Sequence, residues 1–413
     1  MMDVMAVSKR RNSKRRLIIL FVLLGLAAAY VLLCLYLPLK SLNVSQGSNT
    51  LSITTQPSNL PWPSGGEAAV GLADGTVIQS HGVQKPLPMA SVAKLITALA
   101  VLKKYPLSPG QSGPMITIDA TDYGFYTKYI AEQGSVVPVY SGEQLSEYQM
   151  LEAMLVPSGN NIADSLARWA YGSVAAYDNY ASSFVKQLGL NNTHIGTDAS
   201  GYLPNTTSTA NDLIKLGSYV LANQVLQQIV AMKSVNVPNV GVMDNYDNIL
   251  GTDGIIGIKT GNSNQAGGVF LGAANTTVNG KQVTLLTAVM GAPGLLQALS
   301  DTIPLTISME NDFSQTILVS KGEVVGEFNQ PWGGNIQVAA AQNLIVYLLQ
   351  GQTAKAKLNI ANLSVPSPAG KEIGTITAEA NQFNAAVSVP LITLQQTSQP
   401  SWSWRLAHPG AIF

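Results

Sequence analysis

Cysteine and histidine are scarce in this sequence. Its 413 residues include one cysteine, Cys34, and three widely separated histidines, His81, His194 and His408. A single cysteine excludes a disulfide bond within the chain. Metal sites usually combine several closely spaced cysteine, histidine or carboxylate ligands, and no such spacing occurs around these four residues. We therefore expect neither an internal disulfide nor a metal centre.

Charge is also sparse. Charged residues make up 11% of the chain, well below the typical share of about a quarter. The 23 basic residues balance 23 acidic ones, so the formal net charge is zero. Proteins that bind nucleic acid usually carry a clear excess of basic charge. The composition therefore gives no indication of a nucleic-acid partner.

The first segment combines a basic cluster with a long apolar run. The cluster lies between Lys9 and Arg16, and residues 17–39 follow without a charge. A run of about 20 apolar residues spans the hydrocarbon core of a bilayer, and basic flanks favour the cytoplasmic side. We expect a cytoplasmic N-terminus at residues 1–16 and a transmembrane signal anchor at 17–39, with the remaining chain outside. Cleavage as a signal peptide after Ala27–Ala29 is the alternative.

The residues after the anchor lack a clear period. Residues 40–64 are rich in Ser, Asn, Thr, Gln and Pro, which is typical of a flexible linker. We expect ordered structure to begin near Glu67. Residues 109–144 are expected to be irregular, apart from short strands such as Met115–Ile118 and Val136–Val139.

Apolar runs bounded by turn residues predict the strands of a sheet. Ala69–Leu72 and Thr76–Ile78 flank Asp74-Gly75, a pair that favours a hairpin turn. Much later in the chain, similar patterns predict strands at Ile255–Ile258, Val269–Leu271 and Val283–Met290.

The first motif with chemical potential is Ser91-Val92-Ala93-Lys94, followed by the apolar run Leu95–Leu102. On a helix, residues three apart share one face. A serine hydroxyl is a weak nucleophile that needs an adjacent base, and a neutral Lys94 can be that base. A helix N-terminus at Ser91 also favours developing negative charge. The alternative is an N-cap serine with a solvated lysine.

A second motif, Ser158-Gly159-Asn160, lies between two predicted helices. Ser146 and Gln149 form a capping-box pattern that opens the first helix, and the second is expected from about Asn161 to Tyr171. On a tight turn, Ser158 and Asn160 can point into a common space. The alternative is that these residues only serve the turn, as Ser, Gly and Asn commonly do.

The third motif, Lys259-Thr260-Gly261, follows the strand at Ile255–Ile258. Lys259 and Thr260 offer a positive charge and a hydroxyl to an anionic group. Gly261 can allow a substrate backbone to approach the strand edge closely.

These three motifs, in this order, resemble those of the serine D-Ala-D-Ala carboxypeptidases, the low-molecular-mass penicillin-binding proteins of bacteria. The likeness covers about Glu67–Gly294. It extends to the segments between the motifs, which are Met150–Ala167, Leu188–Thr193, Ser208–Asp212 and Gly257–Gly268.

The resemblance implies an α+β fold of the DD-peptidase/β-lactamase type. In this fold an antiparallel sheet is flanked by helices and interrupted by an all-helical lobe. We expect this catalytic domain at residues 65–300 and a small C-terminal β domain, a β-sandwich in the family, at 305–413. Many relatives end in an amphipathic membrane helix; here the N-terminal anchor is expected to hold the protein at the bacterial cell membrane.

The resemblance also implies acyl transfer with no metal or organic cofactor. The substrate is a peptidoglycan stem peptide ending in D-Ala-D-Ala, and β-lactam antibiotics are covalent inhibitors. Ser91 is the nucleophile, Lys94 the base, and Ser158 passes a proton to the leaving D-alanine. The residues expected to bind substrate are Asn160, Lys259, Thr260, Gly261 and Asn262, with the backbone N–H groups of Ser91 and Asn262 as the oxyanion hole.

Other functions fit parts of this pattern. A class A β-lactamase uses a glutamate to activate the deacylating water, and no glutamate lies between Asn160 and Lys259. A non-catalytic wall-binding protein on the same scaffold is a further alternative. Relatives often hold the terminal carboxylate with an arginine, but none occurs from Trp169 through Trp404. Endopeptidase or esterase action therefore stays open.

Overall fold

The computed structural model describes residues 2–46, 49–380, 383 and 385–412. The chain forms two compact units. One, here called the catalytic unit, comprises Thr54–Ser314 and Tyr347–Gln352. The other, called the β unit, comprises the residues up to Ile53, Gln315–Val346, and the residues from Thr353 onward.

The catalytic unit is built on a five-stranded antiparallel sheet. Two helices, α7 (Ala210–Ala222) and α9 (Leu295–Asn311), pack on it. Thr287 Oγ1 lies 3.2 Å from Thr306 Oγ1 of α9, whereas the preceding residue, Leu286, packs beside Gly217 of α7. Consecutive strand residues point to opposite faces, so the two helices cover opposite faces of the sheet. The strand order is β11 (Ile255–Ser263), β12 (Gly267–Val278), β13 (Lys281–Ala292), β3 (Glu67–Leu72) and β4 (Val77–His81).

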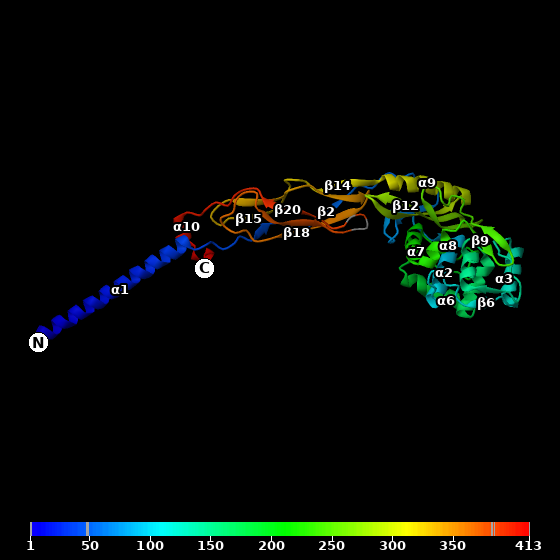
Figure 1. Cartoon of the computed structure of the whole chain (residues 1–413), viewed down its shortest axis with the longest axis horizontal. Coiled ribbons are helices and arrows are strands. Elements are labelled where there is room, and N and C mark those ends of the chain that lie inside the picture. Colours follow the sequence, from blue (N-terminus) through cyan, green and yellow to red (C-terminus); the bar gives the residue numbers. More distant parts are fainter. Residues whose placement is uncertain (1, 47–48, 381–382, 384, 413) are drawn as a thin grey trace. The chain divides into compact units, whose positions relative to one another are not determined.

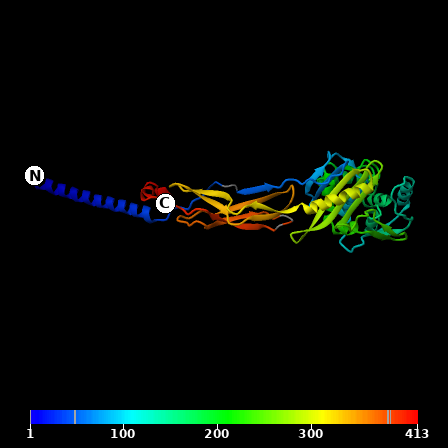
Figure 2. The same cartoon turned by 90° about the horizontal axis from the view of Figure 1, so that it is seen from above.

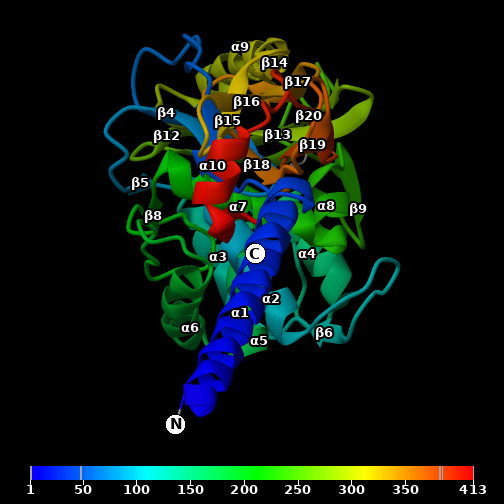
Figure 3. The ribbon, with the colours of Figure 1, turned by 90° about the vertical axis from the view of Figure 1, so that its left-hand side faces the viewer.

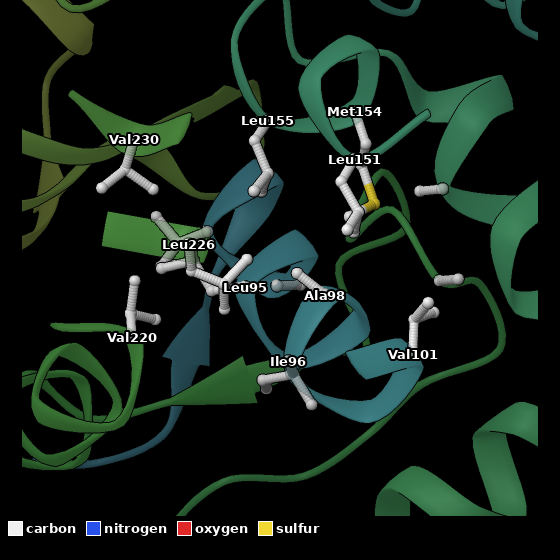
Figure 4. Packing of buried hydrophobic residues seen from close by; sticks show 14 of the residues in the cluster. Leu95, Ile96, Ala98, Val101, Leu151, Met154, Leu155, Val220, Leu226 and Val230 are labelled. Carbon is white, nitrogen blue, oxygen red and sulfur yellow. The ribbon is translucent and has the colours of Figure 1, made fainter. Parts of the chain in front are cut away.

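A helical lobe surrounds α2 (Lys94–Lys104), which follows directly from the short 3-10 turn η1 (Ala90–Ala93). Figure 4 shows Leu95, Ala98 and Val101 of α2 among apolar side chains of neighbouring helices. Full burial of such a side chain contributes about 1.5–3 kcal/mol. The rest of the lobe comprises α3 (Ala120–Ala131), α4 (Glu147–Leu155), α5 (Asn160–Tyr171), α6 (Val174–Gln187) and α8 (Gln224–Val230).

Three two-stranded ribbons complete the catalytic unit. They pair β5 (Leu87–Pro88) with β8 (Thr207–Ser208), β6 (Met115–Thr117) with β7 (Gln144–Ser146), and β9 (Ser234–Val237) with β10 (Gly241–Asp244).

The β unit contains a seven-stranded sheet that combines distant parts of the chain. Its two N-terminal strands, β1 (Val44–Gln46) and β2 (Thr50–Thr54), form the two edges of a sheet of C-terminal strands. Figure 2 shows the N-terminal chain in blue beside the orange C-terminal strands. The order is β1, β15 (Val324–Asn329), β16 (Asn335–Ala340), β20 (Val387–Thr393), β19 (Glu372–Ala378), β18 (Thr353–Ile360) and β2. A separate pair joins β14 (Phe313–Val319) and β17 (Leu344–Leu349).

The N-terminal helix α1 (Met2–Tyr36) contacts the short C-terminal helix α10 (Trp402–Ala407), which the turn η2 (Pro409–Ala411) follows (Figures 1 and 3). The Arg405 guanidinium donates to the carbonyl oxygens of Cys34 and Leu37. Cys34 lies in the last turn of α1, and Leu37 is the first residue after the helix. Among the described residues, Lys14–Tyr36 is the one helical stretch long and apolar enough to cross a membrane.

Several expectations from the sequence differ from the structure. Residues 40–64, expected as a flexible linker, contain β1 and β2, because their pairing partners lie in the distant C-terminal segment. In the expected irregular stretch 109–144, a capping box of Asp119 and Asp122 begins the helix α3. No strand forms at 136–139, where the Asn161 amide bonds both backbone groups of Val137.

The expected start of the β domain at residue 305 falls inside α9. Leu305, Ile307 and Met309 alternate with polar residues, which resembles a strand pattern, and Pro304 disfavours a helix interior. Burial of Leu305 and Met309 against the sheet outweighs both local signals. The predicted hairpin, the strands at Ile255, Val269 and Val283, and the helices on either side of Ser158 are confirmed.

Candidate active site

Ser91 lies on the turn η1, three residues before Lys94 begins α2. Ser91 is half-buried. The preceding residue, Ala90, has a φ of +44°, which is uncommon for a residue with a side chain. No side chain caps η1, so its first N–H groups have no side-chain acceptor. Ser91 is thus held at a helix N-terminus beside backbone donors.

Two glycines allow other segments to pass close to this turn. A Cβ on Gly261 would lie 2.9 Å from the Met89 carbonyl oxygen, and a Cβ on Gly201 would collide with the Ala90 carbonyl oxygen. A side chain at Gly261 or Gly201 would push its own segment away from the turn that carries Ser91. The sequence interpretation assigned Gly261 to substrate approach. In the structure, Gly261 makes room for the turn that carries Ser91.

The Lys94 side chain is fully buried and ends beside Ser91. Its Nζ lies 2.7 Å from Ser91 Oγ, 2.7 Å from Asn160 Oδ1 and 3.1 Å from the Ser200 carbonyl oxygen. A neutral amine has two N–H donors and one lone pair, whereas Asn160 Oδ1 and the carbonyl oxygen can only accept. These acceptors therefore take both donors, and the lone pair faces the Ser91 hydroxyl.

The charge state of Lys94 follows from its surroundings. Burial holds the pKa of Lys94 well below its ordinary value, and the positive charge of Lys259 lowers it further. Asp198 and Asp164 raise the pKa of Lys94 and oppose this effect only in part. The balance favours the neutral amine, which is the form that a general base requires.

Ser158 occupies the turn between α4 and α5. Its φ is +63°, in the left-handed region that costs a non-glycine residue about 1–2 kcal/mol. The side chain is buried, and Ser158 Oγ has no hydrogen-bond partner among the described residues. The next helix begins two residues later at Asn160, which places Ser158 and Asn160 at the same end of α5.

Strand β11 carries the third motif. Lys259 and Thr260 are buried, and Lys259 Nζ has no hydrogen-bond partner in the part of the chain that the structure describes. Burial lowers the pKa of Lys259 to about 7, and the Asp247 charge opposes this shift. Asp247 is itself buried, which raises its pKa to about 6. Lys259 is therefore poised between its charged and neutral forms near neutral pH.

A cleft of about 600 Å³ opens over these side chains. Lys94 and Lys259 are buried and do not line it themselves, but each adjoins a residue that does: Lys94 Nζ contacts Ser91 Oγ, and Lys259 precedes Thr260 in the chain. The other six residues predicted from the sequence all line it; they are Ser91, Ser158, Asn160, Thr260, Gly261 and Asn262. Glu132 is the one charged residue among the described residues that line this cleft.

Sequence analysis missed the polar groups behind Lys94, namely Ser200, Asp198 and Asp164. All three are buried, and a buried polar residue in a loop looks like an exposed one in the sequence. One signal was present for Asp164. It lies four residues after Asn160 on a predicted helix, and residues with this spacing share a helical face.

Comparisons with known proteins agree with this geometry. The family model described as D-alanyl-D-alanine carboxypeptidase matches residues 56–294, more than half of the chain. D-alanyl-D-alanine carboxypeptidase DacC of Escherichia coli is 22% identical over 344 residues, which are 81% of this chain and 84% of that protein. An Escherichia coli protein named D-alanyl-D-alanine endopeptidase is 29% identical over 250 residues, which are 58% of this chain and 74% of that protein.

A solved structure shares the fold. Penicillin binding protein 5 from Haemophilus influenzae superposes with a TM-score of 0.57 at 20% identity, over 83% of this chain and 98% of that chain. The expected α+β fold of the DD-peptidase type is thereby confirmed. Taken with the match over residues 56–294, it follows that the chain belongs to the D-alanyl-D-alanine carboxypeptidase family of serine peptidases.

Proposed function

We propose that this protein removes the terminal D-alanine from peptidoglycan stem peptides through an acyl-enzyme on Ser91. One observation carries the proposal: Lys94 Nζ lies 2.7 Å from Ser91 Oγ, and two fixed acceptors hold its remaining donors. Membership in the family supplies the substrate class.

The reaction begins when Ser91 Oγ attacks the carbonyl between the two terminal D-alanines, and Lys94 takes the hydroxyl proton. The backbone N–H groups of Ser91 and Asn262 hold the negative oxygen of the tetrahedral intermediate. Loss of one such donor typically costs about 3–4 kcal/mol. As the C–N bond breaks, Ser158 relays a proton to the departing amine. Water then hydrolyses the acyl ester and restores Ser91.

Lys259 and Thr260 bind the terminal carboxylate of the peptide. The buried Lys259 ammonium has no partner among the described residues, so a carboxylate that enters the cleft meets a charge that no protein anion neutralises by direct contact. Asn160 both orients Lys94 and lines the cleft. No arginine is available between Trp169 and Trp404, which makes Lys259 the main cation for this carboxylate.

Penicillin labelling tests the assignment. A fluorescent penicillin should acylate Ser91, and mass spectrometry of the digested protein should locate the adduct there. Because the chain has no glutamate between Asn160 and Lys259, the adduct should turn over slowly. A label on another serine, or rapid penicillin hydrolysis at about 10 per second or above, would contradict the proposal.

Endopeptidase cleavage of crosslinked peptides is the second candidate. Two observations favour it: the absence of an arginine from Trp169 through Trp404, and the similarity to a relative named as an endopeptidase. Digestion of uncrosslinked and crosslinked muropeptides by the same preparation distinguishes the two. Release of free D-alanine from uncrosslinked pentapeptide supports the carboxypeptidase, and conversion of dimers to monomers supports the endopeptidase.

We further propose that residues 17–39 anchor the protein in the bacterial membrane, with residues 1–16 in the cytoplasm. The helix at Lys14–Tyr36 and the basic residues before it support this orientation. Protease added to cells with a permeable wall should degrade the catalytic unit while sparing an N-terminal tag. Active protein in the culture medium with a new N-terminus after Ala29 would show cleavage instead.

A further inference from the structure

A buried carboxylate behind Lys94 takes no part in the mechanism above. Asp164 lies on α5, four residues after Asn160, and is 2% exposed. Its Oδ2 accepts a hydrogen bond from the Tyr129 hydroxyl at 2.8 Å, and its Oδ1 accepts one from the Ala199 N–H at 3.0 Å. Both carboxylate oxygens are therefore engaged inside the protein.

These two bonds reach the turn that carries Ser200. Ser200 follows Ala199 in the chain, and its Oγ lies 3.3 Å from the Tyr129 hydroxyl. The Ser200 carbonyl oxygen is one of the two acceptors that hold Lys94. Asp164 is thus connected to Lys94 Nζ through a single dipeptide, Ala199-Ser200.

Other groups hold the same turn in different ways. Asp198 accepts from the N–H groups of Ser200, Tyr202 and Leu203, which fixes the shape of the turn from within. Thr97 of α2 donates to the Ala199 carbonyl at 2.6 Å. Among the described residues, Asp164 is the one whose hydrogen bond ties the turn to α5. Because α5 also carries Asn160, both acceptors of Lys94 are supported by one helix.

We propose that Asp164 is a positioning residue for Lys94. It fixes the Ser200 carbonyl relative to Asn160 Oδ1, and so keeps the lone pair of the Lys94 amine directed at the Ser91 hydroxyl. This inference rests on the proposed function, because it assumes that Lys94 is the base for Ser91.

The charge of Asp164 also acts on Lys94. Lys259 on β11 lowers the pKa of Lys94, whereas Asp198 and Asp164 raise it. Removal of the Asp164 charge should therefore lower the pKa of Lys94 and provide the neutral base at a lower pH.

The groups that face Asp164 come from the helices α2, α3 and α6 and from the turn. They are Tyr129 and Lys128 on α3, Asp198 in the turn, and Tyr177 and Asp178 on α6, in addition to Lys94 on α2. Burial raises the pKa of Asp164 to about 6, so its carboxylate is mostly ionised above pH 7. The effect of its charge on Lys94 should be measured above that pH.

The test compares Asp164→Asn with the wild-type full-length protein in detergent. The second-order rate of Ser91 acylation by fluorescent penicillin is measured from pH 5 to pH 10. Asparagine can accept only one of the two hydrogen bonds and carries no charge. We expect the acid limb of the pH profile to move to lower pH. The acylation rate on the plateau should fall about tenfold. A catalytic group misplaced by ~1 Å can lower the rate about 100-fold, and loss of one of several contacts to the turn should move Lys94 by less than that.

Two further variants separate the possible causes. Tyr129→Phe keeps the Asp164 carboxyl group but removes the hydroxyl that Asp164 and Ser200 share. That hydrogen bond lowers the pKa of Asp164, but Asp164 should remain mostly ionised well above pH 7. The plateau should therefore fall, while the acid limb should move less than in Asp164→Asn. Asp178→Asn is the matched control. Asp178 is a half-buried carboxylate on α6 that feels Asp164 and Asp198, but no hydrogen bond to the Ser200 turn is found among the described residues. Its profile should match that of the wild type.

The outcomes separate this inference from the proposed function. If the wild-type protein is not labelled on Ser91, the proposed function itself fails. If the wild type is labelled and Asp164→Asn has the same acid limb and plateau, Asp164 does not position Lys94. A loss at every pH with an unshifted acid limb, matched by a lower Tm, would show that Asp164 only stabilises the fold. Should Asp164→Asn not fold, an unchanged plateau in Tyr129→Phe would overturn the inference.

Discussion

The two buried lysines of the site illustrate two ways of preparing a catalytic group. Both are inaccessible and both have a lowered pKa. Lys94 makes three hydrogen bonds, to Ser91 on η1, to Asn160 on α5 and to the Ser200 turn. Lys259 has no partner for Nζ among the described residues. In the proposed mechanism the first lysine is fully arranged before substrate binds, whereas the second makes its bond to the substrate carboxylate.

This contrast predicts how each lysine responds to a change of substrate. A group whose partners all lie within the protein should matter equally for every substrate that acylates Ser91. A group without partners in the protein should matter only for substrates that bring a hydrogen-bond partner for it, such as a free terminal carboxylate. The predictions below test this difference, beginning with the largest expected effect.

Replacement of Lys94 by alanine should lower the acylation rate by about 100- to 10,000-fold, the range typical of general-base catalysis. The loss should be similar for a D-Ala-D-Ala peptide and for the same peptide with an amidated C-terminus. Single-turnover acylation kinetics with both peptides provide the measurement. A loss confined to the free carboxylate would assign Lys94 to substrate binding and erase the contrast with Lys259.

Replacement of Lys259 by methionine should reduce acylation by the free D-Ala-D-Ala peptide by about 10- to 150-fold. This corresponds to one charge-assisted hydrogen bond of about 1.5–3 kcal/mol. The amidated peptide should lose much less, because it never makes that contact. If both substrates lost the same factor, and acylation also moved to higher pH, Lys259 would act mainly by keeping Lys94 neutral.

Two substitutions of Ser158 separate the backbone strain at its positive φ from the proposed role of its hydroxyl. Both Ser158→Gly and Ser158→Ala remove the buried hydroxyl and should slow acylation by peptide. Glycine adopts a φ of +63° without strain, whereas alanine does not. The glycine variant should therefore be more stable than the alanine variant by about 1–2 kcal/mol, measured by urea unfolding. Equal stability would mean that the turn relaxes when the hydroxyl is lost.

Asp247→Asn should have the smallest effect. The Asp247 charge raises the pKa of Lys259, so its removal should lower that pKa below about 7. At any pH near 7, a smaller fraction of Lys259 is then in the ammonium form. Binding of the free carboxylate peptide should then weaken at a lower pH than in the wild type, by less than about tenfold, since one pKa unit corresponds to about 1.4 kcal/mol. Inhibition by a non-reactive D-Ala-D-Ala analogue between pH 6 and 9 measures it. A shift toward higher pH would contradict the assigned sign.

The sequence revealed the parts of the site that local spacing determines. Ser91 and Lys94 are three residues apart where the turn η1 continues into α2, and Ser158 and Asn160 are two apart at the start of α5. Their proximity therefore follows from helix and turn geometry. The Ser200 carbonyl lies 106 residues from Lys94 in the chain, and a backbone group leaves no mark in the residue pattern. Sequence motifs therefore identify the reacting side chains, but not the groups that orient them.

The same limit explains the errors in the fold. The sequence predicts a flexible linker where the strand β2 forms, because its partner β18 lies at Thr353–Ile360 and nothing in the local sequence indicates that pairing. In α9, packing against the sheet overrides the strand-like alternation and Pro304. In both cases contacts between distant residues decide the structure, which local propensity cannot indicate.

The edge strands β1 and β2 also set an order of assembly. Val44 pairs with Phe328, and the whole of Thr54–Ser314 is synthesised between the two strands that meet. Closing so long a loop carries an entropic cost that only the completed sheet repays, while the contacts within Thr54–Ser314 are available earlier. Most of the catalytic unit, the segment Thr54–Ser314, can therefore form its internal contacts before β15 to β20 complete the seven-stranded sheet. In a nascent chain that still lacks β15 to β20, the strands β1 and β2 have no partner strands. Limited proteolysis of such a chain should therefore cut first within β1 and β2.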